Sequence, residues 1–507
     1  MRLHRTFLLV PLFLLSVRAP LPERLHLVVL HTNDVHGQLL PRTATWMREE
    51  PKPLVGGVER FANYVESVRA DAPDSVLLVD GGDWFQGTPE GMIDDGDAFM
   101  KVLARVGYDA MCVGNHEFDY GVDALQGQLA ETEVPAVLTG VTNAEGRSLP
   151  GIPEYLLLER AGLRIAVVGL VTPSTPDITH ESTRALLFES PSKALARVRA
   201  ELDQLEPPVD LVLPLTHIGV NSDRVLAKAH PDLPLIVGGH SHTFLKNGVN
   251  EGTVSIVQTG TKLSAVGRVD LWFDADTKEL LKKSVRVVSL LEEVPAAERD
   301  EELAQACAKL VKRSAKVMDE VLGELVQGLQ RASGKHRSST AGNFITDTMR
   351  DYAKADVAIQ NQGGIRTNLA AGAVDRRALF ELLPFGNNLV VLTMTGSQLE
   401  AIVRRSVEGM AHTPIEFSGM QVTVSVDDAA TRLEGIQLAG RAIVAEARYR
   451  VATNSFLAGG GDGYIEFAAI QRRDSDPILL RDLLARAFEG KAKVQPASDN
   501  RILVLKP

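Results

Sequence analysis

The sequence predicts an α/β fold with at least two domains, and three observations support this prediction. Short apolar runs alternate with amphipathic stretches over about the first 290 residues, a pattern typical of buried strands layered with helices. The chain has 507 residues, which is more than one hydrophobic core usually serves. From about residue 295 the character of the sequence changes, which indicates a boundary followed by a second domain.

Six apolar runs in the first part each end in a polar or glycine-rich exit and are predicted to be strands buried on both faces. GGVERFANYVESVRA at 56–70 and SKALARVRAELDQL at 192–205 have helical spacing and are predicted to be intervening helices. The six runs are LHLVVLHTND (25–34), SVLLVDGGD (75–83), DAMCVGNHE (109–117), RIAVVGLVTP (164–173), VDLVLPLTHIG (209–219) and LPLIVGGHSH (233–242).

The stretch 295–325 is rich in Ala, Glu, Lys and Leu at helical spacing and is predicted to be one long linker helix. It would join a first domain at 25–294 to a second domain at 326–507. The second domain has its own glycine-rich stretches, NQGGIR and LAGGGDGY.

Residues 1–19 are predicted to be a secretory signal peptide, because a basic start precedes an apolar run that is too short to span a membrane. The chain is therefore expected to be secreted or periplasmic, with no stable membrane span after cleavage. An uncleaved membrane anchor is the alternative. Export would permit a disulfide between Cys112 and Cys307, but their apolar and helical surroundings favour two separate buried thiols.

Composition and charge exclude one class of partner. The formal net charge is −11 and there is no long basic block, which argues against a nucleic-acid polymer as partner. With 45% apolar and 23% charged residues, the chain has the composition of an ordinary globular enzyme. The sequence leaves the oligomeric state open.

Aspartate, histidine or asparagine follows five of the predicted strands. Carboxyl ends of strands in α/β folds converge on one crevice, so these side chains are expected to meet there. Each one alone has a simpler explanation, since an aspartate after a strand is usually a cap or turn former. Their joint occurrence is harder to explain by chance. The side chains are Asp34, His36, Asp83, Asn115, His116, Asp119, His217, His240 and His242.

This set of donors predicts two divalent metal ions. Carboxylate, imidazole and amide oxygen suit zinc, manganese, cobalt or iron, and no cysteine takes part. Pairs of metals ~4 Å apart recur in enzymes that hydrolyse phosphate esters, where they activate a water and neutralise phosphoryl oxygens.

The blocks NDVHG, DGGDWFQGT, GNHEFDYG, LTHIG and GGHSH resemble the five metal-site blocks of calcineurin-like metallophosphatases. Over nearly the whole chain, the sequence more closely resembles the secreted 5′-nucleotidase and UDP-sugar hydrolase family. This resemblance implies a four-layer α/β/β/α metallophosphatase domain, a linker helix, and a C-terminal α/β domain that binds the substrate.

The resemblance also implies roles for these residues. Asp34 and His36 would hold one metal, and Asp83 would bridge both. His242 would complete the first site at a position where relatives commonly have glutamine, although a position behind or outside the site remains the alternative. Asn115, His217 and His240 would hold the second metal, His116 and Asp119 would form the catalytic pair, and Glu117 is expected to be incidental.

The C-terminal domain offers side chains suited to a nucleotide. Arginines match phosphate, glycine-rich turns admit close approach, and Phe385 and Phe456 lie in polar loops where a base could stack, with core packing as their alternative. The resemblance favours stacking and assigns substrate binding to Arg337, Asn361, Gly363, Arg366, Phe385, Phe456 and Asp462. In this loop Gln362 replaces a common glycine.

The predicted function is release of phosphate from nucleoside 5′-monophosphates, a small-molecule substrate, by water that metals activate. UDP-sugars, ADP or ATP, and 2′,3′-cyclic nucleotides are alternative substrates for the same machinery. A nucleotide-binding protein without turnover would be expected to lack a metal ligand or His116, and none is missing. The family resemblance further implies rotation of the C-terminal domain about a hinge around Lys312 to Glu324.

Overall fold

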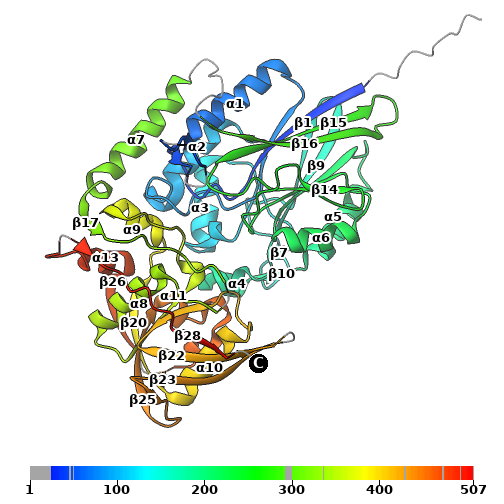
Figure 1. Cartoon of the computed structure of the whole chain (residues 1–507). Coiled ribbons are helices and arrows are strands. Elements are labelled where there is room, and N and C mark those ends of the chain that lie inside the picture. Colours follow the sequence, from blue (N-terminus) through cyan, green and yellow to red (C-terminus); the bar gives the residue numbers. More distant parts are fainter. Residues whose placement is uncertain are drawn as a thin grey trace, which may run out of the picture.

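The computed structural model describes residues 24–505, apart from 45–46, 50, 292–299, 335, 428–429, 471–472 and 492. The predicted signal peptide and the first part of the predicted linker lie outside the described residues. The chain forms two domains that lie against each other (Figure 1). Three short helices lie at the junction between them: α4 (Thr175–Ile178), α9 (Arg376–Leu382) and α13 (Leu480–Arg486).

The N-terminal domain contains two six-stranded sheets. In the first sheet, four parallel strands are joined on one side to two antiparallel strands, and in the second, four parallel strands have one antiparallel strand at each edge. The first sheet has the order β16 (Leu280–Ser289), β15 (Ala265–Asp274), β1 (Arg24–Thr32), β4 (Val76–Asp80), β5 (Ala110–Cys112), β6 (Ala136–Val137). The second has the order β13 (Val249–Glu251), β14 (Val254–Val257), β12 (Leu235–Gly238), β11 (Leu211–His217), β9 (Leu163–Val171), β8 (Tyr155–Arg160).

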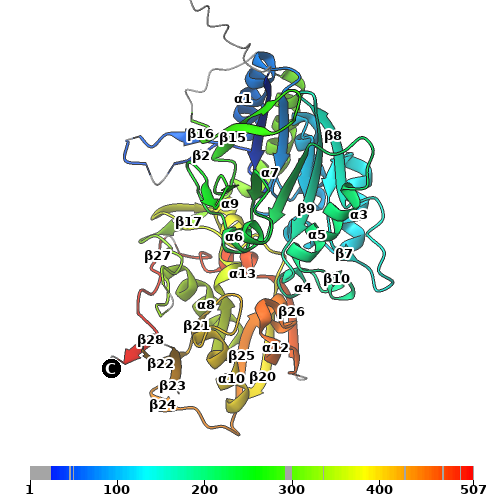
Figure 2. The same cartoon turned by 90° about the vertical axis from the view of Figure 1, so that its right-hand side faces the viewer.

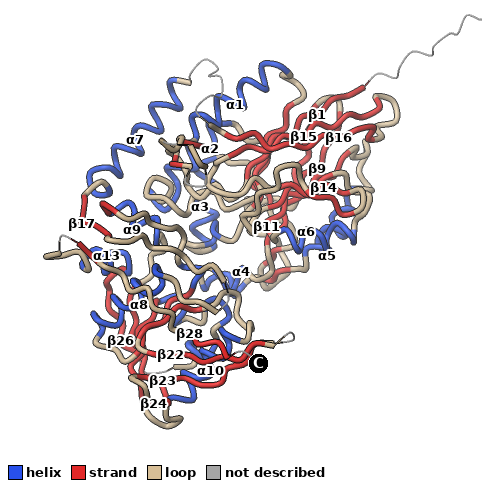
Figure 3. The backbone as a smooth tube through the Cα atoms, in the orientation of Figure 1, coloured by secondary structure: helices blue, strands red, loops and turns tan. Residues whose placement is uncertain are grey.

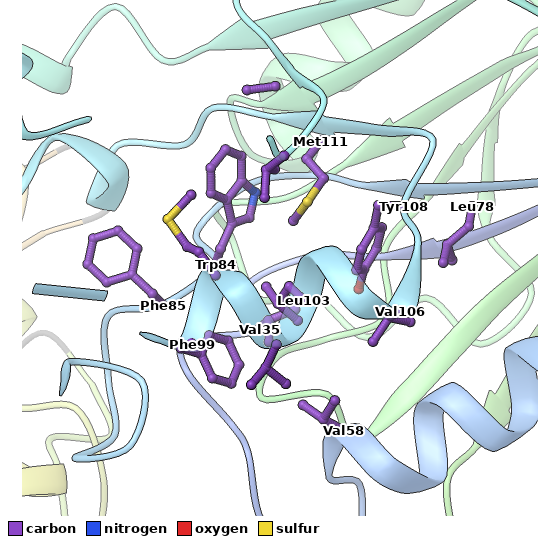
Figure 4. Packing of buried hydrophobic residues seen from close by; sticks show 14 of the residues in the cluster. Val35, Val58, Leu78, Trp84, Phe85, Phe99, Leu103, Val106, Tyr108 and Met111 are labelled. Carbon is purple, nitrogen blue, oxygen red and sulfur yellow. The ribbon is translucent and has the colours of Figure 1, made fainter. Parts of the chain in front are cut away.

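Helices cover the outer face of each sheet, which gives the four layers α/β/β/α expected from the resemblance (Figures 1 and 2). The inner faces meet in a core that includes Leu27 and Leu77 from one sheet and Leu213 and Val237 from the other. Around α2, rings such as Trp84 pack beneath the first sheet (Figure 4). The covering helices are α1 (Val58–Asp71), α2 (Asp97–Val106) and α3 (Val122–Thr132) on the first sheet, and α5 (Pro191–Leu202) and α6 (Val220–Ala229) on the second.

All six predicted strands are present, as β1, β4, β5, β9, β11 and β12, and both predicted helices are present as α1 and α5. The apolar runs correspond to strands that are buried on both faces, because these strands contact helices on one side and the partner sheet on the other. Cys112 and Cys307 are both free and buried, so the prediction of two separate thiols is confirmed.

The predicted linker helix is shorter than 295–325. α7 runs from Glu301 to Met318 and is capped by Asp300, whose side chain accepts hydrogen bonds from the second and third residues of the helix. Residues 321–325 form a strand instead, β17 (Val321–Leu325), which pairs with β19 (Gly372–Asp375) and β27 (Lys493–Val494). Helical spacing did not reveal this change, because pairing with distant strands overrides local propensity.

The C-terminal domain is built on a five-stranded sheet and a smaller four-stranded sheet (Figure 3), and the helix at 396–407 shares a core with strands of both sheets. The larger sheet has the order β21 (Ile415–Ser418), β18 (Val357–Asn361), β25 (Arg448–Asn454), β20 (Asn388–Thr395), β26 (Arg473–Leu479). The smaller has the order β24 (Arg441–Ala442), β23 (Thr431–Leu438), β22 (Met420–Val426), β28 (Ile502–Leu505). The main helices are α8 (Thr340–Ala353), α10 (Gly396–Val407), α11 (Ser455–Ala458) and α12 (Ile465–Ala468).

Two further pairs of short strands complete the described elements, β2 (Arg42–Thr43) with β3 (Leu54–Val55) and β7 (Val141–Thr142) with β10 (Leu187–Phe188). Among the helices that the structure describes, none has both the length and the apolar character needed to cross a bilayer.

Candidate metal centre and substrate cavity

The strand exits of the N-terminal domain meet at one place, and many of their polar side chains lie on strained backbone. Asp34, His36, Asp83, His240 and His242 all have φ between +50° and +73°, a region that L-residues rarely occupy. Such strain costs free energy and is typically stored at functional sites, where the surrounding structure holds it in place.

Asp83 lies at the middle of the cluster. Its Oδ2 is 3.1 Å from His217 Nε2 and 3.9 Å from Nε2 of both His36 and His116. His217 Nδ1 donates to the carbonyl of Gly81 at 2.7 Å, so in the neutral ring Nε2 carries a lone pair. That Nε2 is buried and faces Asp83 Oδ2 without hydrogen-bond geometry, which is the arrangement expected of two ligand atoms that share a cation.

A second group of possible metal ligands lies beside Asp83. His36 Nε2 is 3.0 Å from His242 Nε2, and His242 Nε2 is 3.1 Å from Asp34 Oδ1. His36 Nδ1 donates to the carbonyl of Gln86 at 2.7 Å, which again turns Nε2 inward. Ligand atoms of Asp34, His36, Asp83 and His242 all lie within 4.8 Å of one another.

The third group lies on the other side of Asp83. His240 Nδ1 is 3.0 Å from Asn115 Oδ1, and the rings of His217 and His240 meet edge to face with centroids 5.1 Å apart. The backbone N–H of His240 donates to Asp34 Oδ2 at 3.0 Å. The two donor groups therefore share Asp83, and their carboxylate, imidazole and amide donors fit a pair of divalent metals.

The charges of the cluster shift the pKa values of its members strongly. Burial raises the pKa of Asp34, but the imidazoles of His242 and His217 outweigh burial and lower it to about 2. Burial lowers the pKa of His217, but Asp83 outweighs it and raises the value to about 10. Burial and the charge of His217 lower the pKa of His240 to about 4.

Glu117 is not incidental, contrary to the expectation from sequence. Its carboxylate is buried and accepts backbone hydrogen bonds from Asp83 at 2.9 Å, Trp84 at 2.7 Å and Gly114 at 2.7 Å. It therefore ties the loop that carries Asp83 to the loop that carries Asn115. An acidic residue within the predicted site block GNHEFDYG was the available signal, because a carboxylate that is buried at such a site requires several donors.

The predicted catalytic pair is formed. His116 Nδ1 lies 2.8 Å from Asp119 Oδ2, and the hydroxyl of Thr179 donates to the other oxygen, Oδ1, at 2.9 Å. Burial lowers the pKa of His116, but the carboxylates of Asp119 and Asp83 outweigh burial and raise it. The imidazole is therefore oriented with Nδ1 on Asp119 and Nε2 toward the metal cluster.

A cavity of about 880 Å³ lies between the two domains and contains this cluster at one end. Two C-terminal residues reach the cluster directly. Arg366 Nη2 is 3.3 Å from His36 Nε2, and the ring of Phe385 stacks on His116 with centroids 5.5 Å apart. Since the cavity walls come from both domains, the site is complete only when the domains are in this arrangement.

The glycine-rich loops of the C-terminal domain also line the cavity. Asn361 donates to Asp462 Oδ2 at 2.7 Å, and Thr413 donates to the same oxygen at 2.6 Å. A Cβ on Gly461 would lie 2.5 Å from the ring of Phe456, so only glycine leaves room for this ring. Gly363, Phe385 and Phe456 line the same cavity, so six of the seven predicted substrate residues are brought together.

Arg337 is the exception. Both Arg337 and Arg331 are exposed, but only Arg331 is among the residues that line the cavity. Both arginines precede α8 in an irregular segment, where spacing gives no information about which side chain turns inward. The N–H of Arg331 is fixed by Asn368 at 2.8 Å, which places this residue at the cavity wall.

A four-layer domain with a shared-carboxylate metal cluster, joined to a second domain that closes the cavity, defines a metallophosphatase of the calcineurin-like class. Residues 27–244 match the calcineurin-like phosphoesterase family, and residues 314–469 match the 5′-nucleotidase C-terminal domain. The chain belongs to the 5′-nucleotidase family.

Three relatives illustrate this membership. A crystal structure of a 5′-nucleotidase precursor from Thermus thermophilus is 30% identical, covers 95% of this chain and 99% of its own, and superposes with a TM-score of 0.85. A 5′-nucleotidase of Vibrio cholerae is 28% identical over 490 residues, covering 86% of this chain and 85% of its own. Protein UshA of Escherichia coli is 27% identical over 532 residues, covering 95% of this chain and 93% of its own.

Proposed function

We propose that this chain hydrolyses nucleoside 5′-monophosphates to a nucleoside and inorganic phosphate. One observation carries the proposal: a single interdomain cavity is lined both by a metal-ligand cluster and by two phenylalanines in glycine-rich loops. A phosphate at the cluster and a base between Phe385 and Phe456 would occupy this cavity together.

The distances in the cluster support a division of the ligands between two ions. Asp34, His36 and His242 would hold one divalent ion, Asn115, His217 and His240 the other, and Asp83 both. Zinc, manganese, cobalt or iron would suit these donors. When bound, two such ions supply an activated water and neutralise the phosphoryl oxygens.

The remaining side chains hold and orient the substrate. Arg366, 3.3 Å from His36, is placed to bind the phosphate, and His116, held by Asp119, is placed to protonate the departing ribose oxygen. The carboxylate of Asp462, whose position Asn361 fixes, is suited to accept hydrogen bonds from the ribose.

The N-terminal 19 residues are proposed to direct export of the chain to the periplasm or the medium. Their basic start and short apolar run support this proposal. The name of the Thermus relative, a precursor, agrees with processing in that protein.

A nucleotide with a second anionic group is a second candidate substrate. Arg42, Arg184, Lys262 and Arg331 line the cavity in addition to Arg366. Five cations exceed what one metal-bound phosphate requires, which favours ADP, ATP or a nucleotide sugar as further substrates of the same site.

Phosphate release from AMP tests the proposal. We expect turnover with added manganese or zinc and loss of turnover with a chelator, and a panel of ADP, a UDP-sugar and a 2′,3′-cyclic nucleotide would rank the alternatives. Absence of phosphate release with every metal would refute the proposed function.

The two rings offer a sharper test of substrate class. Phe385→Ala and Phe456→Ala should each raise KM for AMP about tenfold or more, from loss of roughly 1–3 kcal/mol of stacking per ring. KM for p-nitrophenyl phosphate, which has no nucleobase, should change far less. Equal damage to both substrates would indicate that the rings only pack.

A further inference from the structure

Thr179 completes a chain of hydrogen bonds that ends at His116. The hydroxyl of Thr179 donates to Asp119 Oδ1 at 2.9 Å, and Asp119 Oδ2 lies 2.8 Å from His116 Nδ1. Thr179 is 8% exposed, so water does not readily replace this contact. With both oxygens engaged, the Asp119 carboxylate cannot rotate without breaking one of the two bonds.

The segment that carries Thr179 also contacts the C-terminal domain. Thr179 is the residue directly after α4, and α4 packs against Gly461–Gly463, the turn that contains Asp462. Asp177 of α4 lies 3.5 Å from His412 of the C-terminal domain. The position of α4, and with it the Thr179 hydroxyl, is therefore defined partly by the domain that carries the nucleoside-binding residues.

We propose that Thr179 is a positioning residue that holds the Asp119–His116 pair in the geometry for leaving-group protonation when the C-terminal domain is seated. This inference rests on the proposed function. In the step concerned, the oxygen of water bonds to phosphorus while the P–O5′ bond breaks. The electron pair of the broken bond stays on O5′, which takes a proton from His116 Nε2. The attacking water releases a proton to solvent, and His116 takes one up from solvent afterwards, so that nucleoside and phosphate result and the enzyme is restored.

The choice of leaving group separates this role from simple packing. A ribose alkoxide is a poor leaving group that requires a proton, whereas p-nitrophenolate leaves without one. Thr179→Val keeps the size of the side chain and removes only the donor. We expect it to lower kcat for AMP about tenfold, the usual cost of losing an orienting partner, with KM unchanged. For p-nitrophenyl phosphate kcat should stay within about twofold, because protonation contributes little there.

Two further variants complete the experiment. Thr179→Ser keeps the hydroxyl and should restore most of kcat for AMP. Thr175→Val, at the first residue of α4, removes a buried hydroxyl that donates to the carbonyl of Thr172, and serves as the matched control. We expect its effect to be similar on both substrates.

The outcomes are distinct. A Thr179→Val loss confined to AMP and rescued by serine supports the inference. Equal loss on both substrates, no loss on either, or the same pattern in Thr175→Val overturns it. Failure of the proposed function would appear separately, as absence of AMP hydrolysis by the wild-type enzyme in the same assay.

Discussion

His242 shows how a single residue can set the character of a metal site. Its Nε2 faces His36 Nε2 at 3.0 Å and Asp34 Oδ1 at 3.1 Å, so it is placed as a ligand of the same ion as those two residues. An imidazole at this position favours zinc or iron more than an amide oxygen does.

His242→Gln is therefore expected to retain phosphatase activity within about tenfold while lowering the ratio of zinc-supported to manganese-supported turnover. Metal-free enzyme titrated with each ion would measure the ratio. His180→Gln is the matched control, because His180 lines the same cavity but is not part of the ligand cluster. An unchanged ratio in His242→Gln would show that His242 is not a ligand.

Glu416, which lies in the C-terminal domain outside the ligand cluster, is expected to make the stability of the protein depend on pH. It is 1% exposed, accepts hydrogen bonds from Ser339 and Gln362, and burial raises its pKa from 4.5 to about 7. The folded state therefore keeps a proton that the unfolded state loses, so its contribution is full below about pH 4.5 and is lost as pH rises through 7.

Glu416→Gln, which mimics the protonated carboxyl, should remove this pH dependence. Its free energy of unfolding in urea should be close to that of wild type at pH 5 and exceed it at pH 8, by about 3 kcal/mol at most. Glu446→Gln, at an exposed position of the same domain, should follow the wild-type curve. Parallel pH profiles for wild type and Glu416→Gln would contradict the assignment.

At the scale of residues, the sequence predicted the site residues that lie at the ends of buried strands. It did not predict the residues whose positions depend on loop conformation. Asp34, Asp83 and His217 could be found because each follows an apolar run whose end has a defined place in an α/β fold. Arg331 could not be distinguished from Arg337, since loop conformation depends on contacts with distant residues. Thr179 could not be predicted for the same reason, because its hydrogen-bond partner, Asp119, lies 60 residues away in the sequence.

At the scale of elements, α7 belongs to the N-terminal domain rather than between the domains. Leu303, Cys307 and Leu310 are part of the core cluster beneath the first sheet, and Arg313 pairs with Asp94 at 2.7 Å. The composition of this stretch predicted a helix. The amphipathic pattern shows that one face of the helix is buried, but it does not show which domain covers that face. β17, three residues further on, is already paired within the C-terminal domain.

The interface between these elements contains a buried ion pair that predicts a large mutational effect. Arg377 of α9 lies 2.5 Å from Glu90, which is 3% exposed, and 3.2 Å from Asp319. Arg377→Ala would leave Glu90 buried without its counterion, so we expect a loss of about 3 kcal/mol in the free energy of unfolding. Its neighbour Arg376 also pairs with a glutamate, Glu320, but that glutamate is 57% exposed.

Arg376→Ala should accordingly cost less than about 1 kcal/mol, because exposed ion pairs contribute little. Urea unfolding of both variants under the same conditions measures the difference. Similar losses in the two variants would mean that burial of Glu90 does not control the energetics of this junction.

At the scale of the whole molecule, the observed arrangement is the closed one, with Arg366 and Phe385 of one domain against His36 and His116 of the other. Entry of a nucleotide into a cavity enclosed by both domains requires their separation. The packing of α7 reduces the range of residues, Lys312 to Glu324, in which a hinge was expected. Because α7 is fixed to the N-terminal domain and β17 to the C-terminal domain, the rotation should occur at Asp319 and Glu320.

Distances measured by fluorescence energy transfer test this location. A dye pair at Glu66→Cys in α1 and Lys316→Cys in α7 should give one distance with and without a nucleotide, because both helices would move as one body. A pair at Lys316→Cys and Arg441→Cys in β24 should report at least two distances, whose populations shift when AMP or a non-hydrolysable analogue binds. The native cysteines are buried, so labelling should be confined to the introduced thiols. If instead the α1 to α7 distance changed while the α7 to β24 distance stayed constant, the hinge would lie before α7, and this helix would travel with the nucleotide-binding domain.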